Sequence, residues 1–200
     1  MQLEVPHYSQ VDKTSCGPVT LQMVLAYLEK NYDLTFLKEK TGVKEGKGIS
    51  TIQIATAAAL LGFPTKFFST TLGFNPENLT MDYYKDYVDI AQGSEVLVQT
   101  AHQAGVKMEE RQLSLEEILS YVTENSIPII LLDWNIVKNK KEKGYHGHFL
   151  PLVGYDEHKV YVHDPGPTNP QANVAIPREI FDEARKAKGT DEDIIVIYKK

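Results

Sequence analysis

The stretch SQVDKTSCGPVTLQMVLAYL, from Ser9 to Leu28, holds the only cysteine of the chain, Cys16. Apolar residues recur after it at helical spacing, and Thr14 or Ser15 can cap the helix that this spacing predicts. Pro18 suits the first turn, where a backbone N–H has no partner inside the helix. The sequence therefore predicts a helix that begins close to Cys16 and places the thiol at its positive end.

This position bears on the chemistry of the thiol. A free cysteine ionises at about pH 8.5, and the positive end of a helix or an adjacent imidazolium lowers that value. The alternative is a buried cysteine that serves as a small apolar side chain. Gly17 favours a reactive thiol, because a residue without a side chain would let a substrate backbone approach the sulfur. The choice depends on which groups the rest of the chain brings to Cys16.

Length and composition narrow the classes of protein. The chain has 200 residues, 42% hydrophobic and 24% charged, which suits a globular domain with a sizeable core. The formal net charge of −6 disfavours nucleic acid as a partner. The lysine-rich run KNKKEKG, residues 138–144, is interrupted by a glutamate and is expected to be a solvated loop. No segment approaches the length and apolarity of a membrane span, so no membrane partner is expected.

The cysteine count and the N-terminal sequence indicate the cellular compartment in which the protein is expected. A single cysteine cannot form an internal disulfide, so the fold does not require an oxidising environment. The N-terminus MQLEVPHYSQ lacks the charged and apolar regions of a signal peptide. The sequence therefore predicts a cytoplasmic protein, unless a leader has already been removed.

The order of the expected elements indicates an α+β fold. Helices dominate the first part of the chain, and strands dominate the second. Helices are expected within residues 14–31, 49–63, 75–92, 94–105, 114–126 and 177–187, and strands within residues 64–70, 127–134, 147–166 (a hairpin) and 193–200. Ser50 and a capping box of Ser114 and Glu117 mark two helix starts. We expect one domain, residues 1–200, with a helical half (about 1–126) packed on an antiparallel sheet (about 127–200) and a cleft between them.

A reactive thiol needs a base, and the chain has six histidines. His148 begins the pattern HFLPLVGY, so it stands at the start of an expected strand, where an imidazole can face the cleft. His146 lies two residues earlier, would point to the same side, and is the best rival. His163 is adjacent to Asp164 and remains a further alternative. The other three are expected at surface or loop positions: His7, His102 and His158.

Two more residues would complete such a site. Asp164 ends the strand KVYVHDPG, and in an antiparallel hairpin this end lies beside the start of the His148 strand. A carboxylate there would fix the tautomer of the imidazole, although Asp-Pro-Gly is also typical of a plain turn. Gln10 lies six residues before Cys16, and its amide could join the Cys16 N–H in holding an oxyanion; a surface glutamine is the alternative. Together the four residues favour an activated thiolate.

At these positions the sequence resembles the papain-like cysteine peptidases, in particular the bacteriocin-processing, double-glycine peptidase-like branch. That branch has a Gln, five residues, Cys-Gly and a Leu-x-Met-Val helix, as at Gln10, Cys16 and LQMV here. Later it has His-Phe, a Gly-Tyr turn and a strand ending in Asp-Pro, as in HFLPLVGY and VYVHDP. The resemblance implies a papain-like fold in which Cys16 is the nucleophile, His148 the base, Asp164 the orienting group and Gln10 the oxyanion donor.

The matching motifs cover about the first thirty residues and roughly residues 127–166. Between them, residues 72–92 are longer than a minimal domain of this kind needs, and we expect them to shape the substrate pocket. The Cys-Gly and His-Phe elements also resemble those of a guanylyl cyclase-like set of small proteins. Because no transporter or membrane segment is visible beside these motifs, we do not expect the role in leader removal coupled to export to carry over.

Residues and resemblance together predict a cysteine peptidase or amide hydrolase that acts on a peptide or other amide through a thioester. An acyl transferase using the same residues and a binding module that keeps the fold are the alternatives. No metal or organic cofactor is implied, because one cysteine and scattered histidines make no compact zinc ligand set.

Overall fold

Seven strands form one sheet in the computed structural model, which describes all residues, 1–200. Their order across the sheet is β2-β1-β7-β3-β4-β5-β6. The strands are β1 (Thr65–Ser69), β2 (Lys107–Glu110), β3 (Ser126–Asp133), β4 (Gly147–Tyr155), β5 (Lys159–Asp164), β6 (Gln171–Pro177) and β7 (Ile194–Tyr198). Neighbouring strands are antiparallel except β1 and β2, which are parallel.

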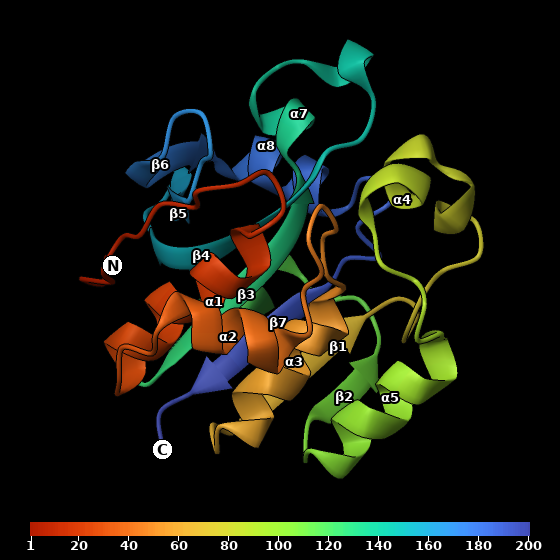
Figure 1. Cartoon of the computed structure of the whole chain (residues 1–200). Coiled ribbons are helices and arrows are strands. Elements are labelled where there is room, and N and C mark those ends of the chain that lie inside the picture. Colours follow the sequence, from red (N-terminus) through yellow and green to blue (C-terminus); the bar gives the residue numbers. More distant parts are fainter.

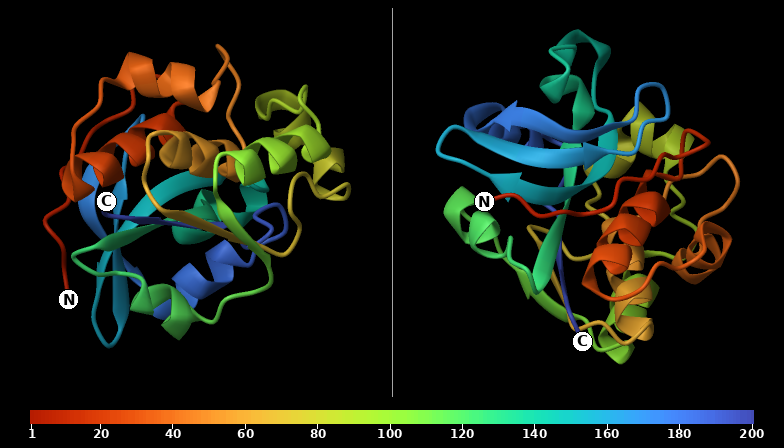
Figure 2. Two further views of the ribbon diagram at one scale, coloured as in Figure 1. Left: turned by 90° about the horizontal axis from the view of Figure 1, so that it is seen from below. Right: turned by 90° about the vertical axis from the view of Figure 1, so that its left-hand side faces the viewer.

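Helices cover both faces of this sheet (Figures 1 and 2). The α-helices are α1 (Cys16–Leu28), α2 (Leu34–Thr41), α3 (Thr51–Leu60), α4 (Asp82–Tyr87), α5 (Ser94–Gln103), α6 (Leu115–Ser120), α7 (Trp134–Val137) and α8 (Arg178–Arg185). Short 3-10 turns occur at η1 (Asn78–Thr80) and η2 (Lys141–Lys143). In the left view of Figure 2, α1, α3 and α5 lie on one side of the sheet, with α6 and α8 on the other. None of the helices combines the length and apolarity needed to cross a bilayer.

The α+β fold and its main elements are confirmed. Helix α1 begins at Cys16, and Ser15 occupies its N-cap position. The hydroxyl of Ser15, however, donates to the carboxylate of Asp12 and does not cap the helix. Helix α3 starts after Ser50 with a capping box, and β3 is buried along its whole length, as its continuous apolar run predicts.

Part of the sequence prediction was wrong. Residues 75–92, expected to be one helix, form only η1 and the short helix α4. The reason is tertiary: the Gly48 N–H donates to the Tyr87 carbonyl, and the Asp89 N–H donates back to the Gly48 carbonyl. The backbone of this segment therefore pairs with a distant loop instead of continuing a helix.

The chain also does not divide, as expected, into a helical half followed by a sheet-forming half. Strands β1 and β2 belong to residues 1–126 and extend the sheet beyond β7. Strand β6 and helix α2 were not anticipated. The thiol and the histidine strand nevertheless come from opposite halves, because α1 packs on β4.

Candidate active site

The loop before Cys16 is organised around the side chain of Asp12. Its carboxylate accepts hydrogen bonds from the Thr14 N–H at 2.9 Å and from Lys38 Nζ at 2.8 Å. Partial burial raises the pKa of Asp12, but the hydrogen bonds from Lys38, Ser15 and Thr14 outweigh it and hold that pKa well below its usual value. An ionised Asp12 therefore fixes the approach of the chain to the start of α1.

His148 and Asp164 meet at the adjoining ends of β4 and β5. The two strands form the antiparallel hairpin expected from the sequence. His148 Nε2 lies 2.9 Å from Asp164 Oδ1, and both side chains are buried. The Gly166 N–H donates to the same oxygen at 2.9 Å; the positive φ of Gly166, +103°, turns its backbone back toward Asp164. Because Asp164 occupies Nε2, the other ring nitrogen of His148 is available to Cys16.

Cys16 and His148 perturb each other's ionisation. Burial raises the pKa of the Cys16 thiol, but a hydrogen bond to His148 and the charge of its imidazolium outweigh burial and lower that pKa. Burial lowers the pKa of His148, while hydrogen bonds with Asp164 and Cys16 raise it to about 9. These shifts favour a thiolate–imidazolium pair at neutral pH.

Gln10 lies at the same cavity as Cys16 and is buried. Its backbone N–H donates to the Pro165 carbonyl at 2.8 Å, and its side-chain Nε2 donates to the Asp12 carbonyl at 2.6 Å. Its Oε1 is buried without a hydrogen-bond partner. The amide nitrogen carries a second hydrogen, so one N–H remains for a bound group.

The other two candidate histidines have different surroundings. His146 lies in the cavity, with its ring centroid 6.3 Å from that of His148, and it makes no bond to Asp164. Burial and the charge of His148 lower the pKa of His146. His163 is buried; its Nε2 donates to the Val5 carbonyl at 2.8 Å, and its Nδ1 accepts from the Asn173 N–H at 3.0 Å. Both nitrogens of His163 are therefore used by backbone, away from the thiol.

The remaining histidines lie outside the cavity. His102 and His158 are exposed, as expected. His7 is half-buried, and its Nε2 lies 2.8 Å from the Asp164 carbonyl. It therefore supports the backbone of Asp164 instead of being a free surface residue.

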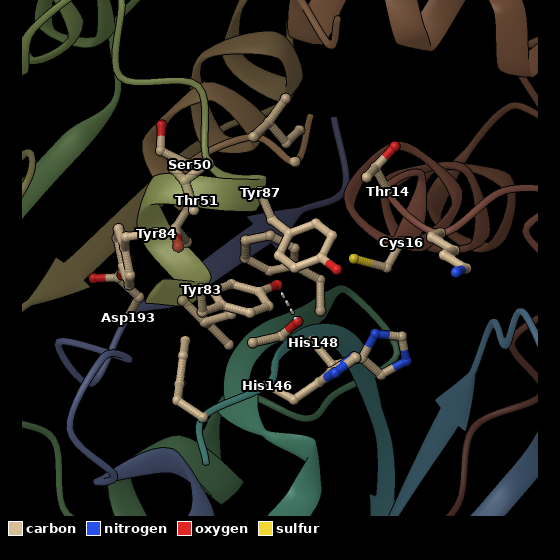
Figure 3. Close-up of a pocket in the computed structure, with 18 of the residues that line it drawn as sticks. Thr14, Cys16, Ser50, Thr51, Tyr83, Tyr84, Tyr87, His146, His148 and Asp193 are labelled. Carbon is tan, nitrogen blue, oxygen red and sulfur yellow. Dashed lines mark hydrogen bonds between the residues drawn. The ribbon is translucent and has the colours of Figure 1, made fainter. Parts of the chain in front are cut away.

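The cavity beside Cys16 has a volume of about 330 Å³. Residues 72–92 contribute Tyr83, Tyr84 and Tyr87 to its lining, so this segment does shape the pocket. The Tyr83 hydroxyl donates to the Gly147 carbonyl at 2.8 Å, next to His148 (Figure 3). Burial and, to a smaller extent, the charge of Cys16 raise the pKa of Tyr83, so its hydroxyl stays a hydrogen-bond donor.

The interpretation of Gly17 was wrong. A Cβ at this position would lie 3.0 Å from Cδ1 of both Ile49 and Ile54. The glycine therefore allows α1 to pack closely against α3 and the loop before it, and it does not line the cavity.

Sequence reasoning missed three features of the site. Asp12 was detectable, because an aspartate two residues before Thr14 is typical of a turn that accepts backbone N–H groups. Tyr83 and Asp193, which also line the cavity, are brought there only by tertiary structure, and no local pattern marks them.

Solved structures with similar folds are peptidase domains. A double glycine motif protease from an AMS/PCAT transporter, in complex with the leader peptide, matches with a TM-score of 0.53 at 22% identity, covering 99% of this chain and 93% of that one. The peptidase domain of Streptococcus ComA gives 0.52 at 16%, covering 96% and 97%. A C39-like peptidase from Bacillus anthracis gives 0.54 at 17%, covering 98% and 96%. These matches confirm the papain-like, double-glycine peptidase-like fold.

The sequence comparisons identify a family that is not named after peptidases. Guanylyl cyclase 1 of Arabidopsis thaliana is 24% identical over 210 residues, which cover 98% of this chain and 76% of that protein. The family model described as guanylylate cyclase matches residues 5–197, nearly the whole chain. The chain therefore belongs to the guanylylate cyclase family, on a fold that it shares with the double-glycine peptidases.

Proposed function

We propose that the protein is a cysteine hydrolase that cleaves an amide bond through a thioester on Cys16. The observation that carries this proposal is the continuous contact from Asp164 to His148 to Cys16 at the wall of a cavity. A cysteine that served only as an apolar side chain would need neither a buried imidazole nor a buried carboxylate beside it.

In this proposal the Cys16 thiolate attacks the carbonyl carbon of the substrate and forms a tetrahedral oxyanion. The Cys16 N–H and the free N–H of the Gln10 side chain would hold this oxygen. The oxyanion then collapses, the C–N bond breaks, and the imidazolium of His148 gives its proton to the leaving amine. Water attacks the thioester while His148 takes its proton, and the acid product leaves as the thiolate re-forms.

A peptide is the substrate class best supported. One of the structural relatives is a protease in complex with a leader peptide. The cavity here, with tyrosines on one side and His146 near the thiol, offers both apolar surface and hydrogen-bonding groups to a short peptide. An acyl transferase would use the same residues, with an amine in place of the water.

The family name makes cyclase activity on GTP the second candidate function, and the lining of the cavity supports it less well than amide hydrolysis. Its lining includes the carboxyl groups of Asp191 and Asp193, only one lysine or arginine, Lys13, and the imidazoles of His146 and His148 beside the thiol. A triphosphate carries several negative charges and is usually held by basic side chains, glycine-rich backbone and a metal ion.

The first test is alkylation of the thiol by iodoacetamide at neutral pH, followed by intact mass. We expect fast single labelling of the natural protein and loss of this rate in His148→Ala. The matched control is His146→Ala, which removes an imidazole from the same cavity without touching Asp164; it should still label fast. Slow labelling of all three folded proteins would mean an inert thiol, and the fold would then be a binding module.

Turnover distinguishes the remaining alternatives. Peptide libraries with and without an added amine acceptor separate hydrolysis from acyl transfer, because only transfer joins the acceptor to the acyl product. GTP with Mg²⁺ provides the comparison for the family name. Cyclic product formed equally by the natural protein and by Cys16→Ala would contradict the thiol mechanism as the main activity.

A further inference from the structure

The end of the cavity away from Cys16 contains two buried polar atoms that have no hydrogen-bond partner. They are Oδ1 of Asp193, just before β7, and Oγ1 of Thr51, the first residue of α3. Both residues line the cavity. Figure 3 shows Thr51, Tyr84 and Asp193 together on one side of the pocket and Cys16 on the other. Buried polar atoms are nearly always paired, so these two exceptions call for a physical explanation.

The polar groups around them are already engaged. The Tyr84 hydroxyl donates to the Gly189 carbonyl at 2.7 Å. The Asp191 carboxylate accepts from Asn75 Nδ2 at 2.9 Å and from Asn78 Nδ2 at 2.8 Å. Asp193 and Thr51 are therefore left mainly with each other: the Thr51 hydroxyl lies near the Asp193 carboxyl group but makes no well-formed hydrogen bond with it.

Ser69 is the remaining neighbour of Asp193. Its hydroxyl donates to the Thr71 carbonyl at 2.9 Å. Burial raises the pKa of Asp193 to about 8, and the nearby Ser69 and Thr51 hydroxyls compensate only in part. A cationic ligand would supply the missing charge and a hydrogen-bond donor at once.

The surroundings also favour a cation. Asp191 adds a second carboxyl group at this end, and Lys13, the only lysine or arginine that lines the cavity, adjoins Thr14 in the loop before the thiol. Phe74 and Tyr84 provide aromatic rings in the lining, and aromatic faces attract cations. No basic side chain of the protein forms a salt bridge with Asp193.

We propose that Asp193, with Thr51 beside it, forms a subsite for an ammonium or guanidinium group, which donates hydrogen bonds to the Asp193 carboxylate. Assigning this cation to the substrate, as the side chain of a lysine or arginine in a peptide, rests on the proposed hydrolase function. The existence of the subsite does not, because it depends only on the lining of the cavity.

Binding of small probes tests the subsite without any catalysis. The probes are n-hexylammonium and the neutral hexanol, titrated into the natural protein while its amide NMR spectrum is recorded. We expect the ammonium to bind about tenfold or more tightly than the alcohol, and to shift the signals of Thr51 and Asp193. Equal affinities, or shifts confined to other regions, would overturn the proposal.

Variants then assign the contacts. Asp193→Asn keeps the size of the side chain and should remove the preference for the ammonium, while Thr51→Val should weaken it several-fold. Glu157→Gln, at an exposed carboxylate outside the cavity, is the matched control and should change nothing. A preference that survives both cavity variants would refute the assignment. If one of them does not fold, the other still decides.

Peptidyl chloromethyl ketones connect the subsite to the hydrolase. A series with lysine or norleucine at successive positions is compared by the rate at which Cys16 is alkylated. A lysine preference of about tenfold at one position, lost in Asp193→Asn, is expected. Equal rates for lysine and norleucine would refute the cation as part of the substrate, whereas failure of every peptide to alkylate Cys16 would count against the proposed hydrolase and leave the NMR result standing.

Discussion

The backbone N–H of Gln10 donates to the Pro165 carbonyl at 2.8 Å, which ties the loop before the thiol to the turn that follows Asp164. A second contact joins the N-terminal segment to Asp164, and a third joins α1 to β4. His7 Nε2 lies 2.8 Å from the Asp164 carbonyl, and Thr20 Oγ1 donates to the Phe149 carbonyl at 2.9 Å. The nucleophile and the base are thus held in place by backbone groups, which gives the site a fixed geometry before any substrate binds.

The Gln10 side chain is expected to act in turnover more than in ionisation of the thiol. Gln10→Ala should lower kcat by about 10²–10³, the usual cost of one lost oxyanion donor. The rate of iodoacetamide labelling should remain close to that of the natural protein, because His148 stays in place. Gln103→Ala, at an exposed glutamine of α5, is the control and should leave both rates unchanged. A kcat unaffected by Gln10→Ala would remove this residue from the mechanism.

The pH dependence should report the Cys16–His148 pair. Since the pKa of Cys16 is lowered, labelling by iodoacetamide should stay fast well below the pH at which an ordinary thiol ionises, about 8.5. Peptide turnover should decline on the acid side as the thiolate is protonated, and on the alkaline side as the imidazolium, with a pKa of about 9, is lost. Labelling that rises only near the ordinary thiol pKa would contradict the ion pair.

Replacing Asp164 should shift the alkaline limit. Its hydrogen bond raises the pKa of His148, so in Asp164→Ala that pKa falls and turnover declines at a lower pH than in the natural protein. Part of the activity should remain, whereas Cys16→Ala should retain almost none. Both variants are compared by turnover over the full pH range. Equal, small losses in the two variants would contradict the assignment of the triad.

Tyr83 should anchor residues 72–92 over the thiol. Tyr83→Phe leaves the Gly147 carbonyl without its donor, at a cost of about 1 kcal/mol in unfolding free energy. A looser wall should raise KM more than it lowers kcat. Tyr32→Phe is the matched control, because Tyr32 is partly exposed, lies outside the cavity, and its hydroxyl makes no hydrogen bond. Urea unfolding and peptide kinetics check both effects; identical behaviour of the two variants would contradict the anchoring role.

Asp193→Asn should stabilise the protein, and more so as the pH rises. The pKa of Asp193 is raised in the folded state from 3.8 to about 8, so folding favours its protonated form. This carboxyl therefore destabilises the fold progressively as the pH increases between these two values, and fully above the higher one.

The measurement is the difference in unfolding free energy between Asp193→Asn and the natural protein at about pH 5, 7 and 9. One pKa unit corresponds to about 1.4 kcal/mol, so a gain of at least about 2 kcal/mol is expected at the highest pH. The other titrating groups are the same in both proteins, so their contributions to the unfolding free energy cancel in the difference. A difference that does not change with pH would show that Asp193 is ionised normally in the folded protein.

The sequence predicts those parts of the site that depend on local structure. Cys16 starts a helix because an apolar periodicity begins there, and His148 meets Asp164 because a short hairpin places their strands side by side. Both relationships extend over fewer than twenty residues of sequence. The resemblance to the papain-like peptidases then predicts that the helix start at Cys16 and the His148–Asp164 hairpin meet in one site.

The far end of the cavity could not be predicted in this way. Thr51 and Asp193 are neighbours only because α3 packs on β7 and β1. Likewise, Tyr83 lies in a segment whose composition suggested a longer helix, which backbone pairing with Gly48 prevents. Strand β6 was missed because it is mostly exposed and lacks a clear alternating pattern.

The position of β7 has a consequence for how the protein is made. This strand lies between β1 and β3 in the middle of the sheet, although it is the last to be synthesised. While the ribosome is still adding residues before 194, the strands on either side of this gap have no partner to join them. Until β7 is in place, β1–β2 and β3–β6 are therefore two separate sheets. A chain truncated before Asp193 would keep the contact of α1 with the His148 strand, β4, but would lack the pocket wall that contains Asp193.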